Sequence, residues 1–236
     1  KAHEDKDKTL DLFDRKHKYQ AQSGLIGEGL PNHRTQFRLV DGPLKLADGA
    51  DELKVRLEAK AANGADIAKI LTFRRDSYLI DVAWEITNPG DKPLTTHAYY
   101  QLQRDDATPE GETRMVSTFT GPAVYTDADK YQKVSFEDIT AGKAKFAKTA
   151  ENGWLAMVQH YFVSAFLPKE NTPREYYMRK VEGQNLYQAG VIVPVAEIAP
   201  GAKGGTSVKL YAGPQEQDSL KKLAPGLDLV VDYGWL

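Results

Sequence analysis

The chain contains 236 residues, of which 41% are hydrophobic and 27% are charged, and its formal net charge is −2. This composition is typical of a globular protein long enough to form one large core. The near-neutral charge, without a dominant basic block, argues against a nucleic-acid-binding surface. Cysteine is absent, which excludes disulfides and thiolate chemistry, and no apolar run approaches the roughly 18 residues of a membrane helix.

The two ends of the sequence differ from its middle. Residues 1–18 are mostly charged or polar, with Leu10, Leu12 and Phe13 as their apolar anchors. Such low apolar content predicts a mobile lead-in. The last four residues are Tyr-Gly-Trp-Leu, and a mature protein rarely ends on an exposed Trp-Leu pair. We therefore expect the chain to be a segment cut from a longer protein.

Alternation of apolar and polar residues predicts strands through most of the chain after residue 35. The clearest strand covers residues 78–87, and the turn residues 88–93 separate it from a second alternating run over 94–103. Two such strands joined by a short turn predict an antiparallel hairpin. Earlier in the chain, three glycines and a proline within residues 23–32 predict a loop.

The uncharged stretch 153–168 is the one around which we expect the fold to be organised. Its large apolar side chains must be covered, because burial of each is worth about 1.5–3 kcal/mol. Their spacing fits a helix as well as two strands. The strand-rich flanks favour two short buried strands with a break near Gln159 and His160.

Further runs predict the remaining strands. Those at 174–181, 186–195 and 206–212 are the clearest, and shorter ones lie at 118–125, 131–136 and 143–147. Gly121 and Pro122 predict a bent or edge strand, and Pro194 restricts its strand to a sheet edge or ends it.

A helix is predicted over residues 214–224 near the end of the chain. Pro214 suits its first turn, Leu220 and Leu223 share one face, and Pro225 with Gly226 ends it. About a dozen strands with this one late helix predict an all-β, mainly antiparallel sandwich.

Histidine and glycine patterns give no sign of a metal or phosphate site. The five histidines lack the spacing of zinc ligands, and a surface or hydrogen-bonded role explains His97 and His160 better than catalysis. Gly27-Glu28-Gly29 begins like a dinucleotide fingerprint, but a third glycine and a following helix are missing.

Two acidic pairs, Asp105 with Asp106 and Asp127 with Asp129, could in principle bind calcium or transfer protons. They lie among turn residues, where aspartate is common for its local geometry alone. We therefore expect no bound metal, no cofactor and no enzymatic activity.

Several segments of the last third resemble a known family. They include Gly-Trp-Leu-Ala-Met-Val-Gln at 153–159, Gly-Pro at 213–214 and the ending Leu-Asp-Leu-Val-Val-Asp-Tyr-Gly-Trp-Leu at 227–236, with weaker matches at 19–25 and 88–94. These segments resemble the YidC membrane protein insertase family of Gram-negative bacteria. The resemblance spans nearly the whole chain, and the ending is its most specific part.

The resemblance implies the large periplasmic domain between the first and second transmembrane helices of an inner-membrane insertase and chaperone. It implies a β-supersandwich similar to galactose mutarotases, with one or two short C-terminal helices. Residues 1–18 would then form the lead-in, 19–212 the sandwich, and 213–236 a helix and connector towards the second transmembrane helix. The implied membrane-proximal connector residues are Pro225, Gly226, Asp232, Tyr233, Gly234 and Trp235.

The same resemblance implies partners for the domain. They are the Sec translocon with its SecDF component, nascent membrane-protein substrates, and the inner membrane itself through transmembrane helices outside this chain. The isolated domain is expected to be monomeric. Tyr233 and Trp235 suit a membrane interface, since each has an apolar body and a polar tip, although Trp235 could instead pack on the domain.

Two alternatives belong to other functional classes. A periplasmic carbohydrate-binding or aldose-epimerase-like sandwich would need an acid and a base across a cleft, for which the sequence offers His97 or His160 with an unspecified carboxylate. A pure spacer would tolerate large deletions.

Overall fold

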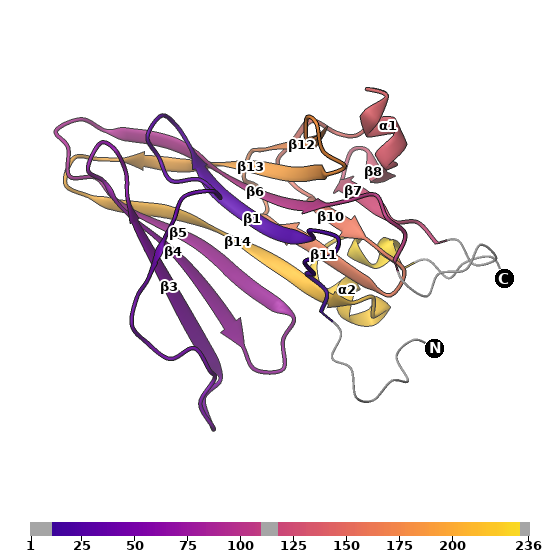
Figure 1. Cartoon of the computed structure of the whole chain (residues 1–236), viewed down its shortest axis with the longest axis horizontal. Helices are drawn as coiled ribbons and strands as arrows, with labels where there is room; N and C mark the ends of the chain where they lie inside the picture. The colour runs from indigo at the N-terminus through magenta and orange to yellow at the C-terminus, as the bar shows by residue number, and fades with distance from the viewer. Residues whose placement is uncertain (1–10, 110–117, 232–236) are drawn as a thin grey trace.

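The computed structural model describes residues 11–109 and 118–231 of the chain. Over these residues the chain forms two antiparallel sheets, one of five strands and one of nine, which stack as two layers in Figure 1. The prediction of an all-β, mainly antiparallel sandwich with short C-terminal helices is therefore confirmed.

The five-stranded sheet contains β1 (Gln20–Ile26), β6 (Leu94–Arg104), β9 (Thr149–Ala150), β12 (Arg174–Lys180) and β13 (Tyr187–Ile198). The nine-stranded sheet contains β2 (Arg38–Leu39), β3 (Glu52–Lys60), β4 (Asp66–Arg74), β5 (Leu79–Thr87), β7 (Gly121–Thr126), β8 (Lys130–Lys133), β10 (Trp154–Val158), β11 (Phe162–Leu167) and β14 (Lys203–Pro214). The helical elements are α1 (Phe136–Thr140), α2 (Gln217–Leu223) and the 3-10 turn η2 (Leu227–Val230). None of these described helices is both long and apolar enough to cross a membrane.

The strand order is β1-β6-β13-β12-β9 in the smaller sheet and β2-β3-β4-β5-β14-β11-β10-β7-β8 in the larger one. The apolar stretch 153–168 forms β10 and β11, which pair with each other and are buried. The predicted pair of short buried strands with a break between them is confirmed.

Two apolar clusters hold the fold together. The main core lies between the sheets, where side chains such as Ile86, Tyr100 and Leu155 are completely buried. The second cluster lies on the outer face of the nine-stranded sheet, where α2 and η2 cover Trp154 and its neighbours. Because residues alternate between the two faces of a strand, β10 contributes to both clusters.

The predicted hairpin over residues 78–103 is wrong. β5 pairs with β4 and β14 in the nine-stranded sheet, whereas β6 pairs with β1 and β13 in the five-stranded sheet. Residues 88–93 therefore form an arch that carries the chain from one sheet to the other. Alternation shows that each strand has one buried face, and it cannot show which sheet the strand joins.

Asn88 holds this arch in place. Its side-chain Nδ2 donates hydrogen bonds to the carbonyl oxygens of Lys92 at 2.8 Å and Ile198 at 3.0 Å. Its own carbonyl accepts from the Gly201 amide at 2.8 Å, and its amide donates to the Ala202 carbonyl at 3.0 Å. Asn88 thus joins the β5–β6 arch to the β13–β14 connection, which crosses between the sheets at the same end.

Pro194 was predicted to place its strand at a sheet edge or to end it. This prediction is wrong, because Pro194 lies inside β13, a long strand in the middle of the five-stranded sheet. The proline pairs with His97 of β6 on one side. On the other side β12 has already ended, because its last pair in this direction is Glu175 with Ile192. The missing N–H therefore interrupts no ladder of hydrogen bonds.

Local errors have simple causes. Residues 23–26 were predicted as part of a loop but belong to β1. Gly24 serves close packing and not a turn, because it lies under the ring of Tyr99, where an added Cβ would come within 2.4 Å of the tyrosine oxygen. The predicted strand at 143–147 is absent, and β7 lies one strand in from the sheet edge. Helix α1 was missed, although Ser135 caps it by accepting a hydrogen bond from the Asp138 amide.

Candidate functional site

The segment that precedes β1 is attached to the end of the sandwich where β6 finishes. The amide of His17 donates to the Asp14 carboxylate at 2.7 Å, and its Nδ1 lies 3.1 Å from an Asp105 carboxylate oxygen. Leu12 and Phe13 pack against the main core. Of the segment predicted to be a lead-in, residues 11–18 thus contact the sandwich, while residues 1–10 lie outside the described residues.

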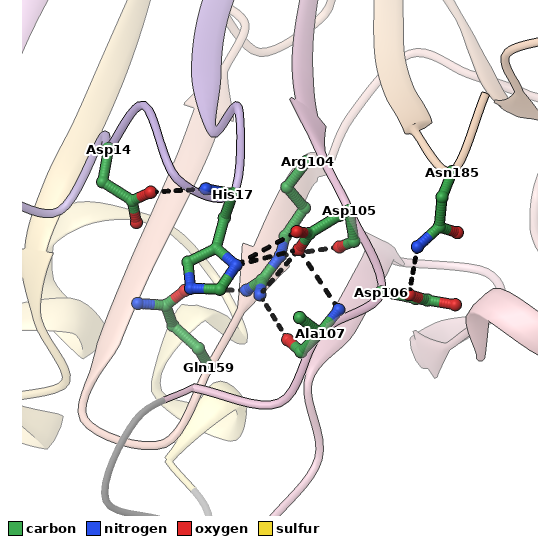
Figure 2. Close-up of polar contacts among 8 residues, drawn as sticks. All are labelled: Asp14, His17, Arg104, Asp105, Asp106, Ala107, Gln159 and Asn185. Atoms are coloured by element: carbon green, nitrogen blue, oxygen red, sulfur yellow. Dashed lines mark hydrogen bonds and ion pairs between the residues drawn. The ribbon is translucent and has the colours of Figure 1, made fainter.

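Arg104, the last residue of β6, is buried at the centre of this end (Figure 2). Its guanidinium donates to the carbonyl oxygens of Asp105 at 3.0 Å and Ala107 at 2.7 Å, and to the Gln159 side-chain oxygen at 2.9 Å. The guanidinium carbon also lies 5.4 Å from the ring centre of Tyr19, in cation–π contact. Several neutral acceptors therefore stabilise the buried charge, and one carboxylate oxygen of Asp105 lies 3.8 Å away.

Tyr19 sits beneath the arginine in the main core. Its hydroxyl is hydrogen-bonded to the Ser164 hydroxyl of β11. Burial raises the pKa of Tyr19 to about 12, against the smaller opposing effects of the Ser164 hydrogen bond and the Arg104 charge. This tyrosine is therefore neutral at ordinary pH and contributes packing and a hydrogen bond.

Gln159 and Gln215 extend the contacts to the C-terminal helix. Gln159 lies in the β10–β11 turn, and its carbonyl accepts from the Gln215 side chain at 2.6 Å. The same Gln215 amide donates to the Phe162 carbonyl at 3.1 Å, just before α2 begins. We call His17, Arg104, Asp105, Gln159 and Gln215 the end cluster. It connects the N-terminal segment, β6, the β10–β11 turn and the start of α2.

The C-terminal segment is docked on the outer face of the nine-stranded sheet. The Trp154 indole stacks on the Tyr125 ring with 5.7 Å between ring centres, and its Nε1 donates to the Pro225 carbonyl at 2.9 Å. Gly226 has φ of 73°, and a Cβ there would come within 2.3 Å of the Tyr125 ring. Glycine is thus required at this position for two reasons, the left-handed backbone and the close approach.

The structure places two of the predicted connector residues, and both belong to this docked segment. Pro225 and Gly226 form the turn between α2 and η2, and they contact Trp154 and Tyr125. The predicted helix is confirmed as α2, which begins three residues after Pro214. The other predicted connector residues lie outside the described residues: Asp232, Tyr233, Gly234 and Trp235.

Arg104 lies one residue beyond the strand predicted over residues 94–103, and it was not predicted as a site residue. The signal was present, because Arg104 continues the inward-facing series of Ala98, Tyr100 and Leu102 along β6. A charged residue at an inward position of a strand indicates either that the position lies at the edge of the sheet or that hydrogen-bond acceptors surround the charge in the interior. Arg104 has such acceptors.

The two histidines considered for acid–base chemistry lie apart. His97 is exposed on the outer face of the five-stranded sheet and lines a hollow with Glu151 and Glu175. His160 follows β10, where its Nδ1 lies 2.7 Å from the Thr118 hydroxyl and its ring contacts Tyr161. Within the described residues, no group of three or more carboxylate or histidine side chains could hold a metal ion.

Comparison with known proteins identifies the family. The family model described as the YidC periplasmic domain matches residues 1–236. The chain belongs to this family. It is 72% identical over 236 residues to the membrane protein insertase YidC of Dechloromonas aromatica (strain RCB), and 59% identical over 239 residues to that of Aromatoleum aromaticum. The whole chain is covered in both cases and spans 43% of each relative's length.

Among solved structures, a galactose mutarotase related enzyme from Lactobacillus acidophilus has a TM-score of 0.47 at 8% identity, covering 76% of this chain and 72% of that one. Membership of the YidC periplasmic domain family agrees with the expected family and favours the main interpretation over the carbohydrate-binding alternative.

Proposed function

We propose that this chain is the non-catalytic periplasmic domain of an inner-membrane insertase and chaperone, and that it assists insertion and folding of membrane proteins with or without the Sec translocon. Its proposed partners are nascent membrane-protein substrates and the translocon with its SecDF component. The proposed organisation keeps residues 1–18 as lead-in, 19–212 as the sandwich and 213–236 as the connector towards the second transmembrane helix. Family membership supports this proposal.

The observation that carries the mechanical part of the proposal is the end cluster. Within the described residues, the segment that enters the fold at His17 and the helix that follows Gln215 are both tied to Arg104 and Gln159. The described N-terminal segment and the start of α2 therefore meet at one end of the sandwich. We infer that this end faces the membrane, and that the docked segment sets how the connector approaches it.

Insertion assays in cells depleted of the natural protein test this role. A full-length Trp154→Phe variant, which releases the Pro225 carbonyl, is expected to slow insertion of a dependent substrate. Trp84→Phe serves as the matched control, because Trp84 is equally buried but lies between the sheets, away from the docked segment. Equal insertion by both variants at equal protein level would contradict a coupling role for the docked segment.

The predicted connector residues allow a second test. Replacing Gly234 and Trp235 in the full-length protein is expected to impair insertion more than changing exposed loop residues such as Lys45. Wild-type insertion by the double variant would mean that these two residues do not couple the domain to the membrane.

A further inference from the structure

The outer face of the five-stranded sheet contains a hollow of about 580 Å³ beside the first residue of β12. β13 continues past this point with β6 as its neighbour, Pro194 opposite His97, whereas β12 reaches only Glu175 opposite Ile192. The hollow is the step left where the sheet becomes narrower. We call it the step hollow, and its lining includes His97, Thr149, Glu151, Glu175, Ile192 and Pro194.

The floor of the step hollow is apolar. Ile192 and Pro194 are half-buried on the outward face of β13, and among the described residues that line the hollow none belongs to a helix. Ile26 lies in the same row of the sheet, opposite His97, and 43% of its surface is exposed. This row therefore runs from Ile26 at the β1 edge, across the His97 imidazole, to Pro194 at the hollow.

The rim of the step hollow is acidic. Glu151 and Glu175 are exposed, and neither forms an ion pair within the described residues. Arg174 also lines the hollow, but its guanidinium is directed inward, where Nη1 donates to the Gly153 carbonyl at 2.7 Å and Nη2 to the Glu151 carbonyl at 3.1 Å. The arginine charge is thus hydrogen-bonded to backbone oxygens, and the two carboxylates remain on the rim of the hollow.

We propose that the step hollow binds an extended polypeptide segment in which Lys or Arg side chains alternate with apolar ones. Alternate side chains of an extended segment point in opposite directions. Glu175 and Ile192 are directly paired and share one face of the sheet. The basic side chains would point to this face, pair with Glu151 and Glu175, and cover Ile192 and Pro194 with their methylene stems. The apolar side chains would point to the opposite side of the segment. Within the described residues, β13 pairs with no strand beyond Ile192 on this side, so the segment would lie beside β13 where β12 has ended.

The segment belongs to a resident partner protein. This assignment rests on the proposed periplasmic location, because the translocated loops of membrane proteins carry few Lys and Arg residues compared with cytoplasmic loops. A hollow built for basic side chains is therefore poorly suited to substrates in transit. A stable membrane or periplasmic partner has no such restriction.

Fluorescence polarisation with the 236-residue chain tests the recognition directly. The probe is a capped nonapeptide in which lysine alternates with valine or threonine, and the comparison peptide has glutamate in place of lysine. The lysine peptide is expected to bind, and the double variant Glu151→Gln with Glu175→Gln to weaken it roughly tenfold. The control variant Glu58→Gln with Glu85→Gln removes the same charge from the other sheet and is expected to change affinity less than twofold.

Three outcomes of this titration would overturn the proposal: no binding, equal binding of the two peptides, or equal weakening by both double variants. The last would indicate attraction by net charge alone. Because the assay uses the isolated chain, its failure leaves the insertion assays unaffected and distinguishes this proposal from the proposed function.

Crosslinking in membranes tests the source of the segment. A photo-crosslinking amino acid in place of Thr149, on the rim, is expected to capture a Lys- or Arg-bearing segment in the full-length protein, and Glu175→Gln is expected to reduce the yield. Release of nascent chains with puromycin before illumination should leave the product unchanged. Loss of the product after puromycin would show that the occupant is a substrate in transit and would overturn the assignment to a resident partner.

Discussion

The indole nitrogen of Trp154 and the carbonyl oxygen of Pro225 lie 2.9 Å apart and join β10 of the nine-stranded sheet to the turn between α2 and η2. The indole is buried, and it also stacks on Tyr125. One side chain thus supplies both the apolar platform and the hydrogen bond for the docked segment.

Replacing Trp154 with phenylalanine should loosen this segment. The variant removes the donor and with it a hydrogen bond to the Pro225 carbonyl, which is worth about 0.5–1.5 kcal/mol. Trp84→Phe is the control, because within the described residues the Trp84 Nε1 has no hydrogen-bond partner to lose. Hydrogen exchange over residues 217–230 should accelerate in the first variant and stay near wild type in the second. Equal protection in both variants would mean that the hydrogen bond does not hold the segment.

Gly226→Ala should also disturb the docked turn, and Gly201→Ala provides its control. Both glycines have φ of 73°, so alanine carries the same backbone penalty of about 1–2 kcal/mol at each. A Cβ at Gly226 would meet the Tyr125 ring, whereas nothing lies within 4 Å at Gly201. Urea denaturation should therefore show a larger loss of stability for Gly226→Ala, and similar losses for both would contradict the close approach to Tyr125.

Arg104→Met is expected to destabilise the domain by roughly 2–4 kcal/mol. Hydrogen bonds made by charged groups contribute about 1.5–3 kcal/mol each and are not additive, and the substitution leaves their acceptors unpaired. Arg56→Met is the control, since Arg56 is partly exposed in ion pairs with Glu58 and Glu85, and such pairs are worth about 0–1 kcal/mol. Chemical denaturation of both variants measures the difference, and a loss for Arg104→Met no larger than that for Arg56→Met would show that the end cluster contributes little.

Lys69 makes stability depend on pH. Its ammonium is largely buried over the Trp84 ring, and burial lowers the pKa of Lys69 to about 8. Below pH 8 the folded protein bears the full cost of a buried charge, and this cost falls as pH rises towards the unfolded value of about 10.4. Lys69→Met should therefore be more stable than wild type at pH 7, by at most about 3 kcal/mol, and the advantage should shrink by pH 9.5. A constant difference across this range would contradict the lowered pKa.

The sequence was sufficient for features that depend on local pattern. The alternation in 52–60, the apolar pair of strands in 153–168 and the amphipathic α2 all follow from spacing and turn residues. The family could also be recognised, because the segment 153–159 and the ending preserve specific residues.

Features that depend on residues far apart in the chain could not be predicted from the sequence. The Asn88 side chain hydrogen-bonds to the Ile198 carbonyl, and Arg104 to Gln159, and neither contact leaves a trace in nearby residues. Pro194 was misjudged for the same reason, since its tolerance depends on where β12 ends. The step hollow also depends on where β12 ends, so no local sequence motif indicates it.

The arch held by Asn88 joins two strands that belong to different sheets, and this affects the order in which the domain folds. β5 and β6 are complete early in synthesis, but their later partners, β14 and β13, begin only at Lys203 and Tyr187. Until those residues are synthesised, each sheet has an unpaired strand edge in its interior, which is an aggregation hazard for the incomplete chain. The domain should therefore fold late and slowly, as high contact order predicts. A stalled intermediate truncated before Tyr187 should be sensitive to protease throughout its length.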